Sequence, residues 1–192
     1  MDIHKMLGVL SGLMLLYAFY PYLKAIVRGE TSPRKATWLV WAAGDTIALA
    51  GQIAQHKVSG LLVGAVIGAS ATFFLSLWHG EKGWNGRDRI CLMLSGFAIA
   101  TWMYFGESNI GIALSLVALL IAAWPTYVSA WYRPENESKK GWIIFNLSSL
   151  IGVLAIPHWT FGDAAPAIVF LIIDVPMLYL LFIRPRSLLR KI

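Results

Sequence analysis

Apolar stretches long enough to cross a lipid bilayer recur along the chain, and they limit its possible folds more than any other feature. A helix needs about 20 residues to span the ~30 Å hydrocarbon core. Runs of about this length occur at 7–27, 36–54, 58–78, 90–106, 109–132, 141–157 and 164–183. With 58% hydrophobic and 14% charged residues, the 192-residue chain is too apolar for a soluble domain. We therefore predict an all-α integral membrane protein with seven transmembrane helices.

The basic residues lie mostly on one predicted side of the membrane. Of the 16 lysines and arginines, only Lys5 and Lys57 lie on the other side. The remaining fourteen are Lys24, Arg28, Arg34, Lys35, Lys82, Arg87, Arg89, Arg133, Lys139, Lys140, Arg184, Arg186, Arg190 and Lys191. Because cytoplasmic loops carry the excess of positive charge, we expect the N-terminus outside and the C-terminus in the cytosol. The localisation that fits is a bacterial inner (plasma) membrane, with the first apolar run kept as a helix. The net charge of +6 is then a matter of topology and does not imply binding to nucleic acid.

Two segments that begin 104 residues apart resemble each other. They are PYLKAIVRGETSPRKATW, from Pro21 to Trp38, and PTYVSAWYRPENESKKGW, from Pro125 to Trp142. Each begins at a proline inside an apolar helix, passes through a basic loop and enters the next helix at a tryptophan. The two prolines, the two tryptophans and a lysine align without a gap, which indicates an internal repeat.

The repeat predicts the domain organisation. Residues 1–80 would form the first three-helix unit, 81–107 a linker helix, and 108–192 the second unit with a basic cytosolic tail. Because a single helix inverts the chain between the units, both units point the same way and form a parallel repeat.

Regularly spaced glycines indicate which helices pack closely together. Gly8 and Gly12 in the first helix, and Gly60, Gly64 and Gly68 in the third, recur every four residues. Such small-residue stripes allow close approach, so the first and third helices are expected to pack together.

Pro21 and Pro125 are hinge candidates. A proline inside a helix cannot donate a backbone hydrogen bond and leaves the carbonyl four residues earlier without its usual partner. Their matched depth in two helices favours hinges, and ordinary kinks are the alternative.

Asp45 and Asp174 are expected near the bilayer midplane. A carboxylate there costs ~2.5–3.5 kcal/mol on insertion scales, and no lysine or arginine lies at that depth to offset it. Each should therefore be neutral, hydrogen-bonded or exposed to water. The alternative is a neutral carboxylic acid that bridges two helices.

The second and sixth helices carry matching stripes of aromatic and polar residues. One face of the second helix presents Trp41 and Asp45, and the sixth presents Phe145 and Ser149 at the same level. The tryptophans that open these helices are more typical of interfacial anchors. The complete set of candidate substrate-binding residues is Tyr17, Trp41, Asp45, Ser70, Trp124, Asn146, Ser149 and Asp174.

Catalytic motifs are not expected. The four histidines lie near helix ends without HxxxH or HExxH spacing, and no phosphate loop or serine nucleophile motif is present. The seventh helix lacks the lysine that a retinal protein needs. We expect neither an enzyme nor a bound cofactor or metal.

The predicted architecture has two parallel three-helix units, a single joining helix and a proline near the cytosolic end of each unit's first helix. This arrangement resembles the SWEET and PQ-loop (MtN3-like) transporter superfamily. The Pro-Gln pair of the name stands here as Pro21-Tyr22 and Pro125-Thr126, so the chain resembles a divergent member. The resemblance implies the helix orders 1-3-2 and 5-7-6 within the units.

The resemblance also implies a function. It suggests a small-solute transporter that works by alternating access, with a polar and aromatic site between the units. In sugar-transporting members an asparagine from each third helix holds the substrate, whereas the 104-residue offset places Ser70 and Asp174 here. Other members couple amino-acid transport to protons through an intramembrane aspartate. We expect a small polar or cationic solute, with protons as possible partners, and a non-transporting scaffold or partner-binding subunit is the alternative.

Overall fold

The computed structural model describes residues 2–81 and 86–183, and these residues are almost entirely helical. They form no strand and seven α-helices: α1 (Ile3–Val27), α2 (Lys35–Ala54), α3 (Gly60–His79), α4 (Gly86–Phe105), α5 (Ser108–Tyr132), α6 (Lys139–Leu154) and α7 (Phe161–Leu178). A short 3₁₀ turn, η1 (Pro134–Asn136), precedes α6, and a π-helical turn, η2 (Tyr179–Ile183), continues α7. Of the predicted basic residues, Lys82 and the tail residues Arg184, Arg186, Arg190 and Lys191 lie outside the described residues.

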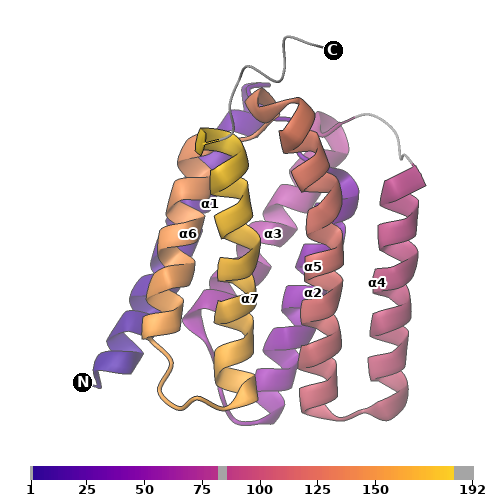
Figure 1. Cartoon of the computed structure of the whole chain (residues 1–192). Helices are drawn as coiled ribbons and strands as arrows, with labels where there is room; N and C mark the ends of the chain where they lie inside the picture. Colours follow the sequence, from indigo (N-terminus) through magenta and orange to yellow (C-terminus); the bar gives the residue numbers. More distant parts are fainter. Residues whose placement is uncertain (1, 82–85, 184–192) are drawn as a thin grey trace.

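Four helical segments among the described residues are long and apolar enough to cross a membrane. They are α1, α3, α5 and the combined segment Phe161–Ile183. The expectation of an all-α, membrane-embedded protein is therefore confirmed. The remaining helices, α2, α4 and α6, run beside these four in Figure 1.

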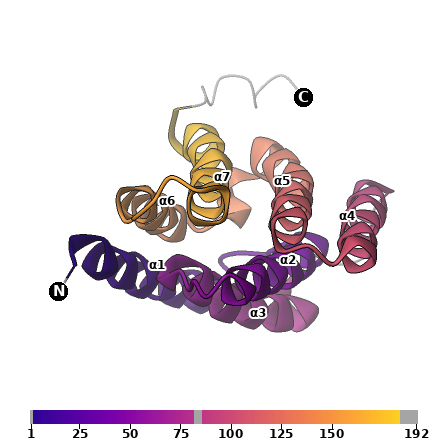
Figure 2. The same ribbon diagram turned by 90° about the horizontal axis from the view of Figure 1, so that it is seen from below.

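The helices form two layers, with α4 at one edge (Figures 1 and 2). In one layer α3 packs against both α1 and α2, and in the other α7 packs against both α5 and α6. The layers meet where α1 packs on α6 and α2 packs on α5, while α4 packs mainly on α5. Within each layer the third helix thus lies against the other two, in the expected orders 1-3-2 and 5-7-6.

Glycines bring α1 and α3 into backbone contact, as their spacing predicted. A Cβ atom on Gly12 would lie 2.5 Å from the carbonyl oxygen of Gly60, and one on Gly64 would lie 2.9 Å from that of Gly12. A Cβ on Gly60 would overlap the carbonyl oxygen of Gly8, and one on Gly68 would overlap the Phe19 ring. Because backbone atoms cannot move aside as a flexible side chain can, only glycine fits at the first three of these contacts.

The contact between α1 and α6 has a counterpart between α5 and α2. Ser11 and Ser148 are fully buried, and each hydroxyl donates to the other residue's carbonyl oxygen, at 2.9 and 2.8 Å. The residues related to them by 104 positions are Ser115 and Gly44, and a Cβ on Gly44 would lie 3.4 Å from the Ser115 carbonyl. The same pair of sequence positions therefore forms a close helix contact twice.

Candidate functional site

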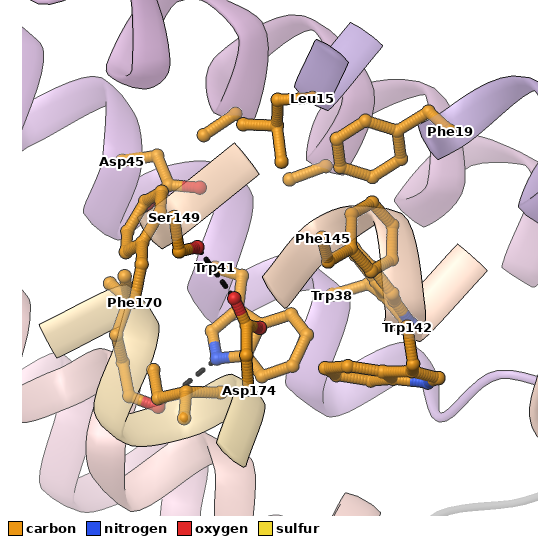
Figure 3. A pocket seen from close by; sticks show the side chains of 14 residues that line it. Leu15, Phe19, Trp38, Trp41, Asp45, Trp142, Phe145, Ser149, Phe170 and Asp174 are labelled. Atoms are coloured by element: carbon orange, nitrogen blue, oxygen red, sulfur yellow. Dashed lines mark hydrogen bonds between the residues drawn. The ribbon is translucent and has the colours of Figure 1, made fainter. Parts of the chain in front are cut away.

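A cavity of about 60 Å³ lies between the two layers and borders the first half of α2. Figure 3 shows the side chains that line it. One water molecule needs about 10–15 Å³, so the cavity has room for a few water molecules. It is lined from six helices by Leu15, Phe19, Trp38, Trp41, Asp45, Ala65, Ala69, Leu119, Trp142, Phe145, Ser149, Phe170, Ile173 and Asp174. Every described helix except α4 contributes to it.

The internal repeat recurs in the lining of this cavity. Ten of the fourteen lining residues form five pairs that are separated by 104 positions: Leu15 with Leu119, Trp38 with Trp142, Trp41 with Phe145, Asp45 with Ser149, and Ala69 with Ile173. Repeated segments that pack at a shared interface are expected to present equivalent positions to it. Trp38 and Trp142 already served to align the two segments, but the other four pairs did not, so they support the 104-residue offset independently.

The polar side of the cavity is formed by two carboxyl groups and one hydroxyl. The Ser149 hydroxyl donates to Asp174 Oδ2 at 2.5 Å, which joins α6 to α7 (Figure 3). Asp45 is 3% exposed, and its Oδ1 atom has no hydrogen-bond partner among the described residues. A buried acceptor without a partner is costly in an apolar environment, so a donor that enters the cavity would bind here favourably.

The opposite side of the cavity is aromatic. The Trp38 and Trp41 ring centroids are 4.8 Å apart, and Trp142 lies 5.5 Å from Phe145 and 6.2 Å from Trp41. Trp38 and Trp142 are 2% and 1% exposed, so the interpretation of these residues as interfacial anchors is wrong. They open their helices, but the tight packing of α1 on α6 and of α2 on α5 buries them.

Glu137 lies in the α5–α6 loop and contacts Trp142, one of the residues that line the cavity. Its Oε2 atom accepts hydrogen bonds from the Tyr22 hydroxyl at 3.1 Å and from Trp142 Nε1 at 2.9 Å. Tyr22 lies on α1 and Trp142 on α6, so Glu137 links the two layers. In the same region the Ser32 amide donates to the Asn136 carbonyl at 3.2 Å, and these positions are also 104 residues apart.

Burial raises the pKa of Glu137 from 4.5 to about 7. The hydrogen bonds from Trp142 and Tyr22 act in the opposite direction, as does the nearby Arg34, whereas the charge of Glu81 adds to the increase. Arg34 is held by ion pairs with Glu81 at 2.9 Å and Asp88 at 3.3 Å. A group with this pKa changes its charge near neutral pH.

A wide vestibule of about 590 Å³ lies at the opposite end, where α1 begins and the α2–α3 and α6–α7 loops lie. Its lining includes His4, His56 and His158, and at its edge Lys57 forms an ion pair with Asp163 at 2.8 Å. Ser11 lines its floor. The hydrogen-bonded pair of Ser11 and Ser148 thus lies between the vestibule and the central cavity.

The structure brings together four of the eight predicted site residues. Trp41, Asp45, Ser149 and Asp174 line the cavity. Ser70 and Asn146 are half-buried and lie beside the lining residues Ala69 and Phe145 without lining the cavity themselves.

Tyr17 and Trp124 do not belong to the site. Their exposed fractions are 64% and 60%, so they lie on the outer surface. Leu15 and Phe19, four residues apart, occupy the inner face of α1, and Tyr17 between them points away because successive helical residues are separated by 100°. Pro21 and Pro125 lie inside α1 and α5, which continue to Val27 and Tyr132.

Glu137 was not predicted as a functional residue. It follows the polar η1 turn in a loop with several charged residues, which is typical of solvent-exposed positions. The only signal in the sequence was its place within the repeated segment that runs from Pro125 to Trp142.

Searches against protein-family models, curated proteins and solved structures find no match to this chain. Among the described residues, no group of three or more His, Cys, Asp or Glu side chains could hold a metal ion.

Proposed function

We propose that this chain is a small-solute membrane transporter that works by alternating access. In this proposal the seven helices all cross the membrane as two parallel three-helix units joined by α4, with the N-terminus outside, as in the SWEET and PQ-loop superfamily. The observation that carries the proposal is the central cavity, because five pairs of repeat-related residues from both units line it. Transporters with internal repeats bind substrate near the midplane at the repeat interface.

The two ends of the cavity support an outward-facing direction of access. The vestibule opens at the end with the N-terminus, whereas the Tyr22–Glu137–Trp142 contact closes the other end. A solute would enter from the vestibule once the Ser11–Ser148 contact separates. It would leave toward the cytosol once Glu137 releases the two aromatic residues.

The prolines provide a physical route to this release. Tyr22 follows Pro21 directly, so the segment of α1 that carries the Glu137 contact begins at a point where the helix lacks one backbone hydrogen bond. Bending at Pro21 would withdraw Tyr22 from Glu137 without disturbing the glycine contacts near the start of α1.

Asp45 and Asp174 would exchange a proton during the transport cycle. This exchange would couple the movement of the two units to a pH gradient.

Spin-label distances test the proposal without a known substrate. One labelled pair at Arg28 and Arg133 reports on the cytosolic end, and a second pair at Val58 and Trp159 reports on the vestibule end. All four positions are exposed. Alternating access predicts two populations in lipid, with a longer distance in one pair accompanied by a shorter distance in the other. A single rigid population in both pairs, unchanged by pH or added solutes, would refute it.

A non-transporting scaffold of the same fold is the second candidate. The Ser149–Asp174 hydrogen bond favours it, because a scaffold requires its aspartates to be held in structural contacts. The unpartnered Oδ1 of Asp45 favours the transporter. A measurement of the hydration of Asp45 distinguishes the transporter from the scaffold, because a scaffold does not require water to reach this carboxyl group.

A further inference from the structure

The hydrogen-bonding groups around the central cavity are unbalanced. The donors on the lining side chains are the three tryptophan indoles and the Ser149 hydroxyl. Trp41 Nε1 donates to the Leu119 carbonyl at 3.0 Å, and Trp142 Nε1 donates to Glu137. The Trp38 ring packs against Tyr22, with centroids 5.2 Å apart. Ser149 donates to Asp174. Three of these four donors are therefore already engaged, and none of the fourteen described lining residues has a buried side-chain donor without a partner.

Acceptor capacity, in contrast, remains available. Asp45 Oδ1 is buried without a partner, and an ionised carboxylate has about four acceptor sites, of which Ser149 occupies one at Asp174. The two carboxyl groups come from α2 and α7, which belong to different layers. A solute held between them would contact both halves of the molecule.

The apolar part of the lining consists largely of aromatic rings. Phe19, Trp38, Trp41, Trp142, Phe145 and Phe170 all border the cavity. The face of an aromatic ring attracts a cation within about 6 Å, and this attraction is stronger when water is excluded. A sugar or another neutral polyol, which needs both donors and acceptors from its site, would leave hydroxyl oxygens without partners here.

From these contacts we infer that the transported solute is a small organic cation whose ammonium group binds between Asp45 and Asp174 and whose alkyl groups pack against the tryptophans. This inference rests on the proposed transport function and names its substrate class. The cavity of about 60 Å³ limits the bound group to an ammonium with few carbon atoms. The donor-only chemistry of an ammonium matches the free acceptors, and its charge offsets the buried carboxylates.

Tryptophan fluorescence of the purified protein provides the test, because three of the lining residues are tryptophans. The probes are ammonium, methylammonium, dimethylammonium and trimethylammonium chlorides, with tert-butanol as a neutral match in size and sodium acetate as an anion. We expect saturable quenching by at least one methylated ammonium and none by tert-butanol or acetate. Asp45→Asn should weaken the binding at least tenfold. Glu135→Gln is the control, since it removes an exposed carboxylate outside the cavity.

Folding of each variant is checked by its thermal midpoint in detergent, and Asp45→Glu, which keeps the charge, should retain part of the binding. Equal binding of tert-butanol and trimethylammonium overturns the cation site, as does unchanged affinity in Asp45→Asn or the absence of binding by every ammonium in the series. Uptake of the same cations into proteoliposomes is measured separately. Binding without uptake contradicts transport but keeps the cation site, whereas uptake of glucose or another neutral solute without ammonium binding keeps transport and overturns the cation site.

Discussion

Replacing Glu137 by glutamine would remove an ionisable group from the contact that joins Tyr22, Glu137 and Trp142. Glutamine keeps the size of the side chain and one carbonyl oxygen that can accept from Tyr22 and Trp142. Any effect of the substitution that varies with pH therefore reports on ionisation rather than on shape. The prediction concerns the balance between a closed form, in which Glu137 is buried, and an open form, in which it is exposed to water.

The size of the pH effect on this balance follows from the pKa of Glu137 in the closed form and in the open form. In the closed form burial raises the pKa of Glu137 to about 7, whereas an exposed glutamate in the open form has a value near 4.5. The closed form therefore binds the proton more tightly, and protonation favours closure. A difference of this size corresponds to about 3 kcal/mol, because each pH unit is worth about 1.4 kcal/mol. This advantage of the closed form is complete below pH 4.5 and is lost progressively as the pH rises through 7.

Spin-label distances between Arg28 and Arg133, measured from pH 4.5 to pH 8, provide the assay. In the wild-type protein the long-distance population should grow as the pH rises and level off above pH 7. In Glu137→Gln the population at this end should lose most of its pH dependence, while Glu135→Gln should behave like the wild type. A pH dependence of the same size in Glu137→Gln would refute the reasoning, because it would place the titrating group elsewhere.

Three further predictions concern packing and movement. Gly12→Ala should lower the free energy of unfolding by about 1–3 kcal/mol, since the new methyl group meets the α3 backbone, whereas Gly8→Ala, with no atom within 4 Å of its Cβ, should leave the thermal midpoint unchanged. Equal midpoints for both variants would contradict the close contact. Ser149→Ala should cost about 1–3 kcal/mol by leaving a buried carboxyl oxygen of Asp174 without its donor, and a midpoint equal to the wild type's would show that the bond adds no stability. Changing both Pro21 and Pro125 to alanine should leave the protein folded but slow its exchange between outward-open and inward-open forms, and unchanged transport would make them ordinary kinks.

The helices and their faces were predictable where the sequence pattern was local. Apolar run length indicated each of the seven helices, because helix formation in an apolar environment depends on residues close in sequence. The prediction that Trp41 and Asp45 share one face of their helix was correct for the same reason, since offsets along one helix determine which residues share a face. The contact of α1 with α3 was also predictable, because glycine spacing reports directly on close approach.

The rotation of α1 and α5 was not predictable from their composition. Both helices are apolar on all sides, and lipid is as apolar as the protein interior, so no polar face distinguishes inside from outside. Tyr17 and Trp124 were selected by residue type, and the structure places them on the outer surface.

The sequence by itself determined that this chain is a bundle of membrane helices with two aspartates in its apolar segments and a repeat of 104 residues. Only the tertiary structure decided which of the candidate side chains surround a common cavity and which groups contact its lining. Burial of Glu137 requires Tyr22 from α1 and Trp142 from α6 to converge on one loop, and the burial of Trp38 requires the two layers to meet. Such contacts join residues far apart in the chain, and they depend on helix packing that no local pattern specifies.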